Sequence, residues 1–125
     1  MHVKVFYWKD SKYLLGGAPE TREQFEKDYV LVREYEAPDG LTAMKVCEDA
    51  FVRLNSERNP LSSRQKQRWL RRSLQPNPHT SISVGDVILI DGYEPAICAS
   101  FGWERLPFSI SQPGRRGNEM VEVEG

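Results

Sequence analysis

The sequence predicts an α+β fold: a small, mostly antiparallel sheet of four or five strands, one long helix packed on it, and a second, basic helix. Three observations predict this architecture. Two β-prone runs lie near the N-terminus, helix-like patterns follow at residues 41–54 and 63–74, and residues 80–108 contain two further β-prone runs. This order lacks the regular strand–helix alternation of a doubly wound parallel sheet.

The first part of the chain predicts two strands separated by a short helix. Residues 3–8 and 29–35 are rich in β-branched and aromatic side chains, which favour strands. Residues 21–28 predict the helix, because Thr21 is a good N-cap and Gln24, three residues later, completes a capping box.

Residues 41–54 predict the longest helix. Their apolar side chains recur every three or four residues, as on one face of a helix: Met44, Cys47, Phe51 and Leu54, widened by Val46 and Ala50. We expect this stripe to be core, so that Phe51→Ala costs about 3–5 kcal/mol. A second helix is expected at residues 63–74, with Ser62 as its N-cap and Pro76 after its end.

A hairpin is predicted at the end of the domain. Ser83-Val84-Gly85-Asp86 predicts a turn that leads into the apolar run Val87–Ile90. Asp91-Gly92 then joins this run to residues 93–100, and Asp-Gly between two β-prone runs is a strong hairpin signal. Pro95 has no N–H for the ladder, so it belongs at the start or on an edge of its strand.

Three short segments resemble a known family. The helix end at residues 50–55 (AFVRLN), the strand entry at 81–87 (SISVGDV) and the return segment at 100–103 (SFGW) are similar to the YodL-like domain of phage, plasmid and mobile-element proteins. The resemblance covers about residues 41–108. It implies an accessory protein of a mobile element in a bacterial host, and it implies neither catalytic residues nor a cofactor.

Length and composition predict one domain at residues 1–111 and a flexible C-terminal tail at residues 112–125, where Gly, Pro and charged residues dominate. We expect deletion of the tail to leave the fold intact. The net charge of −1 gives no overall attraction to nucleic acid or to an anionic membrane. The longest apolar run is far too short for a membrane span, and the N-terminus lacks a signal-peptide pattern, so we expect a cytoplasmic protein.

The two cysteines, Cys47 and Cys98, both fall in apolar patterns. This predicts buried free thiols, with a disulfide between them as the open alternative, because the sequence supplies no distance. Neither a Cys-x-x-Cys nor a His-x-x-x-His pair occurs, so the sequence predicts no metal site and no cofactor.

The basic segment at residues 58–72 is the sharpest functional candidate. It contains six cations and no acid: Arg58, Arg64, Lys66, Arg68, Arg71 and Arg72. On a helix, four of these arginines share one face, and Trp69 lies within the cluster. Such a face can be solvated and paired with the acidic N-terminal half, can contact an acidic protein, or can neutralise phosphates while Trp69 stacks on a base.

Two other groups of residues are weaker functional candidates. Trp8 and Trp103 form a patch suited to a protein partner if they share an exposed end of the sheet. An enzyme would need Ser83, Asp86 and His79, but the first two predict a side-chain-stabilised turn. His79 predicts an exposed loop residue with no carboxylate within five residues.

The residues therefore predict a non-enzymatic protein that binds a macromolecule, and the resemblance adds the setting of a phage or mobile element. A host or element protein is the leading partner, and the alternative is a small nucleic-acid-binding protein that uses residues 58–72. The oligomeric state stays open.

Overall fold

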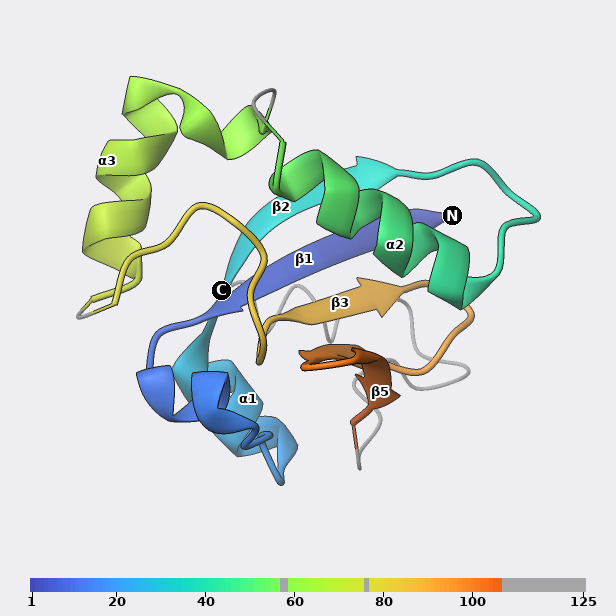
Figure 1. Cartoon of the computed structure of the whole chain (residues 1–125), viewed down its shortest axis with the longest axis horizontal. Coiled ribbons are helices and arrows are strands. Elements are labelled where there is room, and N and C mark those ends of the chain that lie inside the picture. The colour runs from blue at the N-terminus through green and yellow to red at the C-terminus, as the bar shows by residue number, and fades with distance from the viewer. Residues whose placement is uncertain (57–58, 76, 107–125) are drawn as a thin grey trace.

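The computed structural model describes residues 1–56, 59–75 and 77–106, which form one five-stranded antiparallel sheet with helices (Figure 1). The elements are β1 (His2–Trp8), the 3-10 helix η1 (Ser11–Leu15), α1 (Arg22–Asp28), β2 (Tyr29–Glu36), α2 (Ala43–Leu54), the 3-10 helix η2 (Pro60–Ser62), α3 (Arg64–Ser73), β3 (Val87–Ile90), β4 (Ala96–Ala99) and β5 (Gly102–Arg105). The strand order is β2-β1-β3-β4-β5. This confirms the predicted α+β class.

Strand β1 lies inside the sheet because both of its faces are apolar. Val3, Val5 and Tyr7 belong to one core cluster, and Phe6 and Trp8 belong to the cluster on the other face. The strand pairs antiparallel with β2 on one side and with β3, far away in the sequence, on the other. A register shift between Val5 and Phe6 interrupts the ladder with β2.

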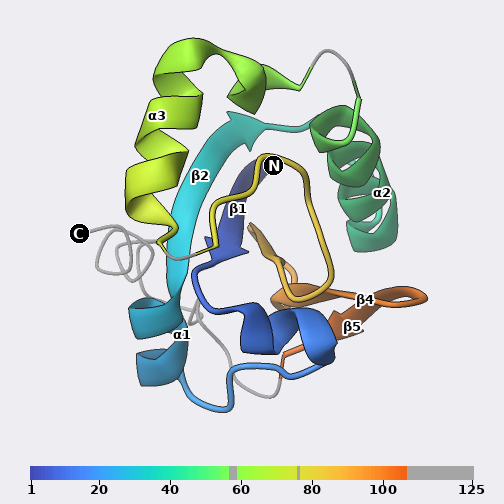
Figure 2. The ribbon, with the colours of Figure 1, turned by 60° about the vertical axis from the view of Figure 1, so that its left-hand side comes forward.

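Helices cover both faces of the sheet. On one face, α2 contributes Ala50 and Leu54 to the core and α3 contributes Leu70. On the other face, Tyr13 of η1 and Phe25 of α1 pack against β1 and β3. In Figure 2, α1 lies apart from α2 and α3. Among the described residues no helix has both the length and the apolar character needed to cross a membrane.

Helix α2 buries most of the predicted apolar stripe but leaves two of its residues exposed. Met44 is 49% exposed and Phe51 is 41% exposed, whereas Val46, Cys47, Ala50 and Leu54 are buried. Met44 and Phe51 are seven residues apart, so they lie together along one flank of the helix, beside its buried sector. The prediction that Phe51 is a core residue is therefore wrong, and so is the expected cost of Phe51→Ala.

Smaller differences concern element boundaries. The N-cap of α3 is Ser63, whose hydroxyl accepts from the Lys66 N–H, and not Ser62. Strand β4 begins after Pro95, and a separate strand, β5, begins at Gly102 after a turn at Ser100 and Phe101. The predicted tail at residues 112–125 lies outside the described residues.

Candidate functional site

The structure brings Ser83, Asp86 and His79 together beside the end of β1. The His79 ring stacks on Tyr7, with ring centroids 4.6 Å apart, and lies 4.2 Å from Trp8. Its Nε2 atom is 3.2 Å from both carboxylate oxygens of Asp86. The prediction of an exposed His79 without a carboxylate is wrong, because the segment between α3 and β3 folds back over β1.

Asp86 ties this segment to the sheet. Its carboxylate is fully buried and accepts hydrogen bonds from the Trp8 N–H at 3.0 Å and the Ser83 N–H at 2.8 Å. The Ser83 hydroxyl donates to the same group at 3.3 Å. The Asp86 carbonyl in turn accepts from the Cys98 N–H on β4. These bonds confirm the predicted side-chain-stabilised turn.

Both ring nitrogens of His79 face acceptors. Nδ1 lies 3.0 Å from the carbonyl oxygen of Asn77, which can only accept, and Nε2 faces the Asp86 carboxylate. Burial by itself lowers the pKa of His79, but the hydrogen bond and charge of Asp86 outweigh it and raise the pKa above its ordinary value. Neither nitrogen is therefore placed to take a proton from Ser83, and the arrangement favours a structural tie over catalysis.

We expect the stability of the protein to fall as the pH rises above about 6.5, the ordinary pKa of histidine. Because the folded pKa of His79 is raised, its contribution is fully present below that pH and is lost as the pH rises through the folded pKa. Burial also raises the pKa of Asp86. Stability therefore also falls as the pH rises through the range in which Asp86 loses its proton, which lies at lower pH. Thermal melts between about pH 6 and pH 9 measure this loss.

The matched control for this pH dependence is His79→Gln, which should flatten it. His2, whose pKa is also raised by bonds to Glu34 and Glu36, is retained in both proteins and cancels in the comparison. Equal slopes for the native chain and His79→Gln would contradict the assignment to His79.

A groove of about 410 Å³ lies between the start of α2 and the strands β4 and β5. Met44 of α2 and Tyr93 of the β3–β4 loop line it, are 49% and 42% exposed, and stand beside Trp103 of β5. The Tyr93 hydroxyl donates to the carbonyl of Leu41 at 3.0 Å, which joins the two walls. We call this the α2–hairpin groove. Sequence reasoning missed Met44 and Tyr93; the Asp91-Gly92 turn was the available signal that Tyr93 lies in a loop.

The charges at this groove are mainly acidic. Glu94 lines it and pairs with Arg105 at 3.3 Å, whereas the Glu104 carboxylate lies on the same face of the hairpin as Ile97, at a second pocket. Glu104 makes no ion pair with any residue that the structure describes. Glu48 lies one turn after Met44 on α2 and is exposed. It also makes no ion pair with a described residue.

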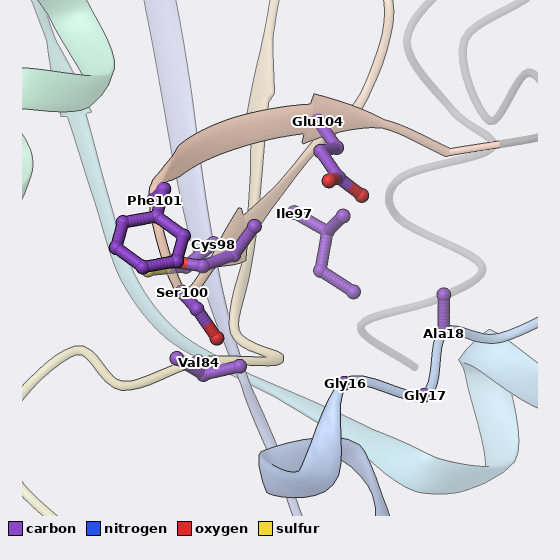
Figure 3. Close-up of a pocket in the computed structure, with 10 residues that line it drawn as sticks. Gly16, Gly17, Ala18, Val84, Ile97, Cys98, Ser100, Phe101 and Glu104 are labelled. Carbon is purple, nitrogen blue, oxygen red and sulfur yellow. The ribbon is translucent and has the colours of Figure 1, made fainter.

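A second pocket, of about 200 Å³, lies on the other side of the β4–β5 hairpin (Figure 3). Ile97 and Glu104 of the hairpin lie across this space from Gly17 and Ala18. Phe101, at the tip of the hairpin, is fully exposed. The hairpin therefore presents an unburied aromatic side chain at this second pocket.

The two predicted tryptophan contacts do not form one patch. Trp8 is only 5% exposed, packs in the cluster with Tyr13 and Phe25, and donates its Nε1–H to the Val84 carbonyl at 2.9 Å. Trp103 is half-buried against the cluster on the opposite face of the sheet. The condition for a shared patch is therefore not met, because β1 is an interior strand and Trp8 is buried on it. Trp103 alone stays a candidate contact.

Helix α3 displays its arginines to solvent. Leu70 is buried on the inner side, and the exposed outer side carries a set that we call the arginine face: Arg64, Arg68, Arg71 and Arg72. Within the described ranges, none of these arginines forms an ion pair with an acid. Within the described residues, the arginine face therefore does not pair with the acidic N-terminal half of the chain. Arg58 lies outside the described residues.

Trp69 is placed differently from the arginines. It is half-buried and packs against the core, and the Lys66 ammonium lies 5.0 Å from its ring centroid. The ring is therefore held by the protein itself on one side and by Lys66, and it is not an open platform for a base.

The cysteines are free and buried, as predicted. Burial raises the pKa of Cys47 to about 12 and that of Cys98 to about 11, so both are protonated, unreactive thiols at neutral pH. Across the described residues, no group of three or more potential ligands is placed to hold a metal ion.

Comparison of the chain with protein-family models, with curated proteins and with solved structures found no match. The resemblance to the YodL-like domain, and the phage or mobile-element setting that it implies, therefore rest on the quoted sequence segments alone.

Proposed function

We propose that this chain is a non-enzymatic binding protein that captures a segment of another protein in the α2–hairpin groove. The observation that carries the proposal is the position of Trp103 in a groove of about 410 Å³, between the half-exposed side chains of Met44 and Tyr93. Tryptophan and tyrosine are enriched at binding hot spots, and methionine adapts its shape to an incoming apolar group. The polar residues around these three provide a solvated rim.

The charge of the groove defines the chemistry of the partner segment. Arg105 already neutralises Glu94, so the exposed Glu48 on α2 leaves an excess of negative charge beside the groove. An apolar anchor residue flanked by lysine or arginine complements this arrangement, because the anchor fills the groove while the cations meet the acidic rim. We therefore assign the partner as a basic segment with one apolar anchor.

The tie between His79 and Asp86 supports the non-enzymatic part of the proposal. His79 directs both ring nitrogens to acceptors, and the Ser83 hydroxyl donates to Asp86, so these groups are engaged in holding the loop. The cysteines are buried thiols with raised pKa values and add no nucleophile.

Selection from a library of random displayed peptides tests the proposal while the partner is still unidentified. Native chain is the bait, and enriched peptides are synthesised and titrated against native and variant proteins. We expect them to share an apolar residue next to lysine or arginine, and we expect Trp103→Ala to weaken binding by about 30-fold, the effect of losing a hot spot of about 2 kcal/mol.

Two further variants make the outcome decisive. Met44→Lys places a cation at the exposed rim, so it should also weaken binding of the basic peptides while the half-exposed site tolerates the change. Phe101→Ala, on the same hairpin but outside the lining of this groove, should bind as the native chain does. Failure to enrich any shared pattern, or equal losses for Trp103→Ala and Phe101→Ala, would refute the groove as the binding site.

A further inference from the structure

We propose that the arginine face of α3 binds the phosphate backbone of a nucleic acid, at a site separate from the α2–hairpin groove. The four arginines lie on one exposed side of a single helix, as described above. This goes beyond the capture of a protein segment, because it assigns a second class of partner to a different surface.

The positive charge of this surface is not cancelled locally. Residues 59–85 contain no aspartate or glutamate, so the acids of the chain lie on other segments. Within the described residues the arginine face makes no ion pair. A polyanion therefore meets guanidinium groups that need not first give up a carboxylate partner.

The first turn of the helix carries its cations against the helix dipole, whereas Arg71 and Arg72 in the last turn are favourably placed. Arg64 and Lys66 occupy the first turn of α3, where no acid is present and where the helix dipole disfavours cations. Like charges at Arg64 and Arg68, and at Arg68 and Arg72, also stand four residues apart and repel. Cations in a first turn and like charges four residues apart are local conflicts of the kind expected at a functional surface.

The composition of the outer face favours phosphate over protein. The exposed positions of α3 hold arginine, lysine and glutamine and no apolar side chain. Protein interfaces have cores that are depleted in charged residues, whereas phosphate oxygens are contacted mainly by arginine, lysine and small polar side chains. Arg64 and Arg72 are eight residues apart, which is about 12 Å along a helix and close to the width of the DNA major groove.

The position of Trp69 limits the mode of binding. Because its ring packs on the core and under Lys66, it does not offer an open face to an unpaired base. Recognition is therefore by charge along the backbone, and we infer that it is independent of base sequence and available to duplex DNA.

Fluorescence anisotropy with a labelled duplex of arbitrary sequence tests this inference on the full chain. The test variant replaces each arginine of the arginine face with glutamine. The control variant replaces four exposed cations on other elements with glutamine: Lys12, Lys27, Lys45 and Arg105. Both variants lose the same number of positive charges, so they have the same net charge, and a thermal melt establishes that each is folded.

We expect the native chain to bind the duplex, with an affinity that falls about 100-fold between about 50 and about 200 mM salt, because about four phosphates are contacted. The test variant should lose about 100-fold in affinity at the lower salt and most of the salt dependence, and the control variant less than about 3-fold. Trp103→Ala should bind DNA normally, which keeps this test separate from that of the groove.

Three results would overturn the inference. One is no binding by the native chain at low salt, and another is equal weakening in the test and control variants, which would show a net-charge effect only. The third is displacement of the duplex by poly-glutamate as readily as by unlabelled DNA, which would assign the face to an acidic protein.

Discussion

Replacing Asp86 with alanine is expected to lower the free energy of unfolding by about 3–5 kcal/mol, as expected for removal of one partner from a buried charged pair. The carboxylate is fully buried and is the acceptor for the N–H groups of Trp8 and Ser83. Its loss also leaves the buried His79 ring without its counter-charge. Denaturant unfolding of the native chain and of Asp86→Ala measures the difference.

Asp49→Ala is the control for this prediction. Asp49 is exposed and, among the described residues, pairs only with Lys45 one turn earlier on α2, so its removal should cost about 0.5 kcal/mol or less. A loss below about 1 kcal/mol for Asp86→Ala would show that the loop between α3 and β3 does not depend on this carboxylate.

Gly85→Ala is expected to destabilise the fold by about 3 kcal/mol or more, because the new methyl group has no space. A Cβ atom at this position would lie 2.6 Å from the Tyr13 carbonyl oxygen and 2.8 Å from the Tyr13 Cβ. The backbone of Gly85 also has a φ of +95°, which other residues rarely adopt. Tyr13 is fixed in the core by its packing, so it cannot move aside cheaply.

Gly92→Ala separates the steric effect from the backbone effect. Gly92 has a similar φ of +85°, but a Cβ atom there would meet nothing within 4 Å. Its replacement should therefore cost only the left-handed penalty of about 1–2 kcal/mol. Thermal melts of both variants compare the two costs, and equal losses would contradict the close contact between Gly85 and Tyr13.

Local signals were sufficient for most of the secondary structure. Thr21 caps α1 as predicted, with its hydroxyl accepting from the Gln24 N–H, because a cap depends on residues only three positions apart. Asp91-Gly92 likewise joins β3 to the strand that returns beside it. Such features do not depend on the rest of the chain.

The buried side of α2 was not determined locally. Phe51 and Ala50 both fit an apolar period of 3.6 residues, and only the docking of the helix on the sheet decides which of them is inside. The burial of Trp8 and His79 was likewise not determined by local sequence. Their burial follows from pairing between β1 and β3 and from the return of a distant loop, both of which join residues more than seventy positions apart.

The shared face of the four arginines on α3 could be predicted from the sequence, because helical periodicity relates residues three, four and seven positions apart. The sequence placed Trp103 just after the predicted hairpin, but it did not predict the further strand, β5, that holds this residue. Two further properties depend on the folded chain: the arginine face has no acidic partner within the described residues, and Trp103 lines a groove with Met44 and Tyr93. Neither could be predicted, because charge pairing and concave shape are made by contacts between distant elements and not within them.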